Sequence, residues 1–145
     1  MNRSIFSIFT GFVVFFLAMA LTVVHPAYGT EAKIIRIFSS VAPHNAISIE
    51  PSEIWVKPGT TVIWNNWAKA DAHILFVKGE GCKEATSARS GFKYDPQKGC
   101  VGTVQEISKG GTASLMFEAT GRFDYTVDLV GEKKSAKGTI LVRPH

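Results

Sequence analysis

The chain has 145 residues, of which 46% are hydrophobic and 19% are charged, so it is long enough for one globular domain and too short for two ordinary ones. Its formal net charge is +4, and the basic residues are scattered rather than interleaved with aromatic ones, which argues against a nucleic-acid-binding groove. The sequence has no Ser-His-Asp signature, no glycine-rich phosphate loop ahead of a helix and no zinc motif, so an enzyme is not expected.

The first 29 residues have the pattern of a secretory signal. Arg3 supplies a short positive region, and no charged residue occurs from Ile5 to Val24. The small residues Ala27 and Gly29 suit signal-peptidase cleavage after Gly29, which predicts a periplasmic or secreted protein. The alternative is an uncleaved anchor, because an apolar run of about 20 residues can span a bilayer. In either case residues 30–145 form the domain that works outside the cytoplasm.

Short β-rich runs, separated by glycine and proline, occupy most of this domain. Alternation is clear near the end of the chain, where Phe123, Tyr125 and Val127 share one face of a run. About seven short strands with this turn spacing, and no long helix, predict an all-β, antiparallel Greek-key sandwich. The runs expected to be strands are residues 33–38, 46–50 continuing after an interruption as 53–56, 61–65, 73–78, 112–117, 123–127 and 138–142.

Residues 79–111 are expected to be a long irregular insertion, with one helical turn around Lys83–Arg89. The segment contains seven glycines and both cysteines of the chain, Cys82 and Cys100. In an exported protein an even cysteine count predicts a disulfide, and closing this loop would stabilise the domain by about 3 kcal/mol. The alternative, a thiolate metal or redox site, lacks the expected C-x-x-C spacing.

Three stretches of the chain share a pattern that is more specific than strand propensity. They are Ile49-x-Pro51-x-x-Ile54-x-Val56-Lys57-Pro58-Gly59-Thr60-Thr61-Val62 with Trp64-Asn65-Asn66 and His73, then Gly111-x-x-x-Leu115-x-Phe117-x-x-x-Gly121-x-Phe123-x-Tyr125, and last Gly138-x-Ile140-x-Val142. Together these stretches resemble the cupredoxin family, the fold of plastocyanin-like blue copper proteins. The resemblance covers most of the domain and implies a cupredoxin-like sandwich.

The resemblance also implies where a blue copper site would lie. Such a site needs two imidazoles and a thiolate in a near-trigonal plane, with a weak axial thioether. His73 matches the position of the first imidazole, whereas the cysteine, second histidine and methionine positions fall on Val127, Val130 and Ala136. Three of the four ligands are therefore absent. No cofactor is expected, and the chain is predicted to act as a binding or interaction protein.

The alternative function is periplasmic copper binding or electron transfer through a rebuilt site. The implied topology brings the loop before His73, the loop 127–137 and the loop that contains His44 to one end of the sandwich. Two imidazoles with a carboxylate can bind Cu(II), so copper remains a candidate cofactor at His44 and His73. The carboxylates expected nearby are Asp71, Asp128 and Glu132. The plainer interpretation is that His73 is hydrogen-bonded at the start of a strand and His44 is solvated.

The same end is a candidate contact surface for an unidentified protein partner outside the cytoplasm. Trp67 lies in the loop before His73, and an aromatic side chain in such a loop is a candidate anchor. Val127, Leu129 and Val130 are predicted to join it in an apolar patch. The alternative is that these aliphatic side chains fill the space that the metal would otherwise occupy.

The two other tryptophans have simpler predictions. Trp64 lies within an expected strand and is predicted to pack in the core. Trp55 lies between Ile54 and Val56, so strand alternation predicts that its side chain points away from theirs.

Overall fold

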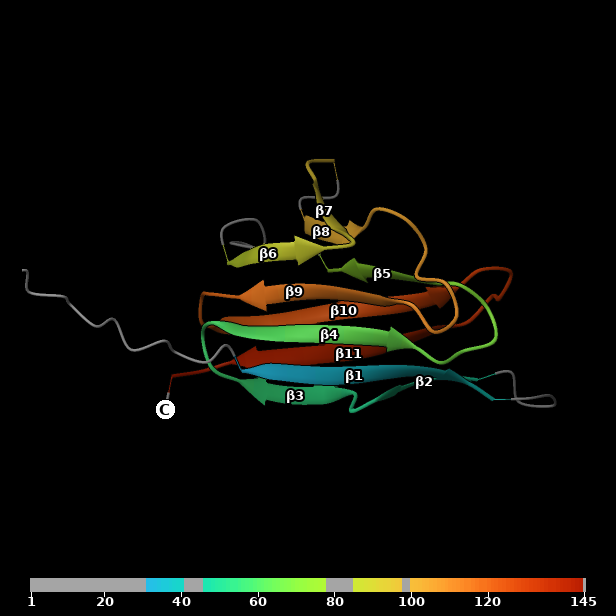
Figure 1. Cartoon of the computed structure of the whole chain (residues 1–145), viewed down its shortest axis with the longest axis horizontal. Coiled ribbons are helices and arrows are strands. Elements are labelled where there is room, and N and C mark those ends of the chain that lie inside the picture. The colour runs from blue at the N-terminus through green and yellow to red at the C-terminus, as the bar shows by residue number, and fades with distance from the viewer. Residues whose placement is uncertain (1–30, 41–45, 78–84, 98–99, 145) are drawn as a thin grey trace, which may run out of the picture.

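The computed structural model describes residues 31–40, 46–77, 85–97 and 100–144, which form a sandwich of two β-sheets (Figure 1). This part of the chain contains eleven strands and no helix. The predicted all-β sandwich is confirmed, and the predicted count of about seven strands is too low. The strands are β1 Ala32–Ser39, β2 Ile47–Glu50, β3 Glu53–Val56, β4 Thr60–Asn66, β5 Ala72–Phe76, β6 Thr86–Ser90, β7 Phe92–Asp95, β8 Cys100–Thr103, β9 Thr112–Phe117, β10 Gly121–Leu129 and β11 Ser135–Val142.

Both sheets are mixed, so the prediction of a purely antiparallel arrangement is wrong. One sheet has the order β2-β1-β4-β9-β6 and the other has the order β3-β11-β10-β5-β8-β7. The chain crosses from the first sheet to the second between β2 and β3, at Pro51 and Ser52. This crossing leaves β1 beside β4, and β3 beside β11, and both of these pairs are parallel.

The core lies between the sheets and is built on aromatic rings. The fully buried Trp64 is at its centre, with ring centroids of Phe76, Phe92 and Tyr125 at 5.8, 5.2 and 5.6 Å. Such edge-to-face pairs stabilise a core beyond the area that they bury. The predictions for Trp64 and Trp55 are both confirmed, because Trp55 is 58% exposed while its neighbours in β3 are buried.

The segment predicted as an irregular insertion in fact widens both sheets. Strand β6 pairs with β9, and the hairpin of β7 and β8 pairs with β5. Residues 86–89 of the predicted helical turn belong to β6 instead. The edge strands β9 and β5 supply backbone hydrogen-bond partners to β6 and β8, which the local sequence cannot reveal. This pairing also buries the side chains of Phe92 and Val101. Gly91, with φ +77°, carries the chain from one sheet to the other.

The predicted disulfide falls partly outside the described residues. Cys100 is fully buried and disulfide-bonded, whereas Cys82 lies outside them, so their pairing stays a prediction. The predicted signal or anchor, residues 1–29, also lies outside the described part of the chain. Within that part, no helix has the length and apolar character needed to cross a membrane.

Candidate functional site

The strands β10 and β11 stay paired at two of the three positions that the resemblance assigns to missing copper ligands, and the third, Val130, lies in the turn between them. Val127 pairs with Ala136 on one side and with Ile74 on the other. Only residues 130–134 remain between the strands, in a turn where Glu132 N–H donates to the Leu129 carbonyl at 3.0 Å. The expected copper loop is therefore the tip of a β-hairpin, here called the hairpin end of the sandwich.

His73 lies on the opposite face of the sheet from the Val127 side chain. In β5, Ala72, Ile74 and Phe76 are buried, so His73 and Leu75 point to the outer face by alternation. His73 pairs with Asp128, a solvent-exposed residue of β10. The position that matches the first copper ligand thus does not face the interior. A metal site at His73 would have to be built on the outer face.

The interior at the hairpin end is closed by a buried amide and small apolar side chains. The side-chain nitrogen of Asn66 donates to the carbonyls of Ala70 and Ile107 at 3.0 and 2.6 Å, and its oxygen accepts from Ala68 N–H at 2.9 Å. Asn66, Ala68 and Ala72 are fully buried. A buried amide that is satisfied in this way fixes the two loops that it joins.

The rebuilt metal site is not tested by the described residues. His44 lies outside them, so its approach to His73 stays a prediction. Within the described ranges, no group of three or more His, Cys, Asp or Glu side chains is placed to hold a metal ion. Asp128 lies across from His73, Asp71 lines a cavity with it, and Glu132 is an exposed residue of the hairpin turn.

Two of the four residues of the predicted apolar patch are exposed and the other two are buried. Val127 and Leu129 are 0% and 3% exposed because they point inward from β10, so they fill the interior as the alternative interpretation held. Trp67 and Val130 are 60% and 50% exposed. The Trp67 ring lies 6.5 Å from that of Phe38, a contact that the sequence did not indicate.

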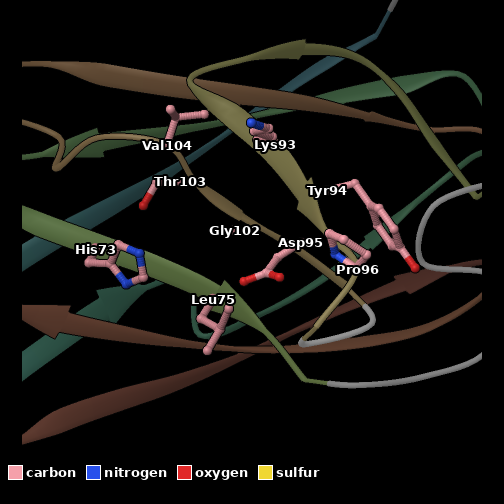
Figure 2. A pocket seen from close by; sticks show the side chains of 9 residues that line it. All are labelled: His73, Leu75, Lys93, Tyr94, Asp95, Pro96, Gly102, Thr103 and Val104. Atoms are coloured by element: carbon pink, nitrogen blue, oxygen red, sulfur yellow. The ribbon is translucent and has the colours of Figure 1, made fainter.

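A cavity of about 350 Å³ lies beside His73 on the outer face of β5, β8 and β7 (Figure 2). In this view His73 of β5 and Asp95 of β7 project over the same space, with Gly102 of β8 between them. Gly102 leaves room at the base of the cavity, because it has no side chain and a Cβ there would lie only 3.1 Å from Leu75 Cδ1. The other lining residues are Lys93, Tyr94, Pro96, Thr103 and Val104.

A second cavity of about 470 Å³ adjoins the first one toward the hairpin end. It shares His73 and Val104 with the first cavity and adds Asp71 and Glu106, together with Gln105 and Ser108. We call the two cavities together the His73 groove. Asp71 and Glu106 line one end of this groove, and Lys93 and Asp95 line the other.

Sequence reasoning missed the His73 groove because half of its wall comes from β7 and β8. A local signal was present: Phe92-Lys93-Tyr94-Asp95 alternates apolar and polar residues and is followed by Pro96. That pattern is typical of a strand that enters a turn. The glycines that surround this stretch make the strand signal weak.

No family model and no curated protein matches this chain. The solved structures similar to it include amicyanins, which belong to the family that the sequence resembles. A methionine variant of amicyanin with Cu(I) is 21% identical, with 77% of this chain and 82% of that chain covered and a TM-score of 0.49. A reduced tryptophan variant is 20% identical over the same shares, also with a TM-score of 0.49. A second Cu(I) methionine variant is 20% identical over 81% and 87%, again with a TM-score of 0.49. These likenesses carry no argument about the site, whose function rests on this chain's own residues.

Proposed function

We propose that this chain is an exported binding protein on a cupredoxin-like sandwich that works without a blue copper centre. Its contact surface is formed by the outward-facing groups near the hairpin end: Trp67, Val130 and the His73 groove. The observation that carries the proposal is the opposite orientation of His73 and Val127. The interior is occupied by apolar packing, whereas polar and aromatic groups that can recognise a partner point outward.

The chemistry of the outward groups supports recognition of another molecule. Trp67 is a large, exposed ring supported by Phe38, and interface hot spots are enriched in such anchors. The His73 groove is concave and combines apolar side chains with a few charged ones, which is typical of a binding site. A protein or peptide partner can engage both features at once.

Copper addition to the purified exported protein tests the absence of a blue copper centre. We expect no stoichiometric copper and no intense thiolate–copper absorption, because the ligand positions inside the sandwich hold Val127 and Ala136. Intense visible absorption would overturn the proposal. The rebuilt copper site would replace this proposal if the protein binds stoichiometric Cu(II) with only weak absorption. In that case His73→Ala should abolish copper binding, whereas Thr126→Ala on the outer face of β10 should retain it.

Photo-crosslinking in cells tests the contact surface. A photoreactive amino acid at position 67 is expected to capture one discrete protein, because that side chain is the proposed anchor. Position 122 is the matched control, since Arg122 is also an exposed residue but lies at the other end of β10. Equal capture at both positions, or none at position 67, would contradict the proposed surface.

A further inference from the structure

A separate cavity lies at the end of the sandwich opposite the hairpin, where β1 begins and β3 and β11 end (Figure 1). It has a volume of about 400 Å³ and the buried Val56 lies in its lining. Its other principal lining residues are Glu31, Lys33, Trp55, Lys57 and Arg143. We call it the Trp55 cavity. It shares no residue with the contact surface of the proposed function, so a proposal about this cavity can be tested independently of that function.

The Trp55 ring is held in place while much of its surface stays open. The Arg143 guanidinium carbon lies 4.0 Å from the ring centroid, within the range of a cation–π contact. The indole N–H donates to a Glu53 carboxylate oxygen at 3.3 Å. The backbone beneath is fixed as well, because Arg143 N–H donates to the Val56 carbonyl at 3.0 Å and Trp55 pairs with Leu141.

The charges around the cavity are predominantly positive. Of the lining residues that the structure describes, Lys33, Lys57 and Arg143 are cationic and Glu31 alone carries a side-chain carboxylate. Lys33 Nζ lies 2.8 Å from Glu31 Oε1, so these two charges largely offset each other. Among the described lining residues, Lys57 and Arg143 are the cations with no opposing carboxylate. The Glu53 carboxylate keeps its negative charge, but it is not part of the lining and accepts a hydrogen bond from the indole N–H of Trp55.

We propose that the Trp55 cavity binds a phosphate-bearing ligand whose apolar or ring portion lies against Trp55. A guanidinium stacked on an aromatic ring keeps the N–H groups at its edge available, and these match two phosphate oxygens. Lys57 adds a second, mobile cation. Trp55 supplies an apolar contact for the remainder of the ligand.

Such a phosphate can come from a lipid headgroup or from a soluble metabolite. Residues 5–24 are free of charged side chains, and Glu31 follows Val24 by seven positions, an extended reach of about 25 Å. If the predicted anchor is retained, the cavity therefore lies within reach of phospholipid headgroups. A soluble organic phosphate satisfies the same lining residues without a membrane.

The experiment compares phosphate sources on the purified chain, in a Trp67→Phe background so that Trp55 is the one highly exposed tryptophan. Glycerol phosphate, phosphatidylglycerol vesicles and phosphatidylcholine vesicles are titrated separately, with tryptophan emission and vesicle co-sedimentation as readouts. We expect saturable binding of one or both of the first two probes, weakened at least tenfold by Lys57→Glu and by Arg143→Gln. High salt should weaken binding as well, because it screens exposed charges.

Lys69→Glu is the matched control, because it reverses an exposed lysine near Trp67 at the other end of the sandwich. All variants share the same N-terminal segment, so its own vesicle affinity cancels in the comparison. Binding of vesicles alone assigns the lipid source, and binding of glycerol phosphate alone assigns the soluble source. The proposal is overturned by no binding of either, or by equal effects of Lys57→Glu and Lys69→Glu. Equal binding of phosphatidylcholine overturns it too, because that headgroup phosphate is already neutralised by its own choline cation and should not be drawn to Lys57 and Arg143. Far-ultraviolet circular dichroism checks that each variant is folded.

Discussion

The two faces of the six-stranded sheet differ most where β5 meets β10. The inner face carries Ala72, Ile74, Val127 and Leu129, none more than 3% exposed, whereas the outer face carries His73 at the edge of an open groove. These opposite environments belong to residues that are adjacent in sequence. Because side chains alternate along a strand, a shift of one residue decides whether an imidazole lies inside the sandwich or outside it.

This difference separates the stability of the protein from its function. Changes on the inner face disturb close packing and should destabilise the fold. Changes on the outer face should leave stability nearly unaltered and affect only recognition. Substitutions on the two faces should therefore differ in their effect on the free energy of unfolding.

The largest effect is expected for Gly138→Ala on the inner face. Gly138 pairs with Tyr125, and a Cβ at this glycine would lie 2.2 Å from Tyr125 Cζ. The buried ring cannot move aside easily, because it packs against Trp64 and Phe76. We expect a loss of about 3 kcal/mol or more in the free energy of unfolding, measured by urea denaturation.

Gly131→Ala in the hairpin turn is the matched control for Gly138→Ala. Gly131 has φ +82°, which costs an L-residue strain, but its Cβ would have no heavy atom within 4 Å. A loss of about 1 kcal/mol is therefore expected. Equal losses for the two variants would contradict the close approach of the Tyr125 ring to Gly138.

The inner and outer positions of the predicted copper site provide the next comparison. Val127→Ala leaves a cavity under β10, because the Val127 side chain is fully buried, and should cost about 2 kcal/mol. His73→Ala removes a side chain that borders solvent and should cost less than about 0.5 kcal/mol. A larger loss for His73→Ala than for Val127→Ala in urea denaturation would refute the opposite orientation of the two side chains.

The smallest effect is expected for Asp124 on the outer face of β10. Arg122 Nε donates to both Asp124 carboxylate oxygens at 3.0 Å, and Thr139 Oγ1 donates to one of them at 2.6 Å. The Arg122 and Thr139 hydrogen bonds lower the pKa of Asp124 in the folded protein. The stabilisation of the folded protein by ionised Asp124 is therefore present above the ordinary carboxyl pKa of about 3.9. It is lost as the pH falls through the lower pKa of the folded state.

Asp124→Asn should reduce the acid-induced fall in stability below about pH 4 and change stability at pH 7 only slightly. The change is small because the Asp124 side chain is 43% exposed, so solvent screens the ion pair. Urea denaturation at pH 7 and pH 3 measures both effects. An unchanged acid dependence in the variant would show that another carboxylate is responsible.

Much of the sandwich could be predicted from local pattern. The runs 53–56 and 112–117 coincide with β3 and β9, and the buried position of Trp64 followed from its place in a strand. The absence of Cys, His and Met from residues 127–137 is likewise a property of the sequence. Period-two alternation and turn residues act over a few positions, so they can be read without knowing the partners of a strand.

The sequence by itself therefore determined the β-sandwich and the absence of Cys, His and Met from residues 127–137, where the resemblance implies copper ligands. Only the tertiary structure decided which face each strand turns inward, and so placed His73 outside and Leu129 inside. It also decided that residues 86–103 add strands to both sheets and build the His73 groove. The physical reason is that alternation defines two faces of a strand but not which one is buried. That choice depends on pairing with strands that are distant in the chain.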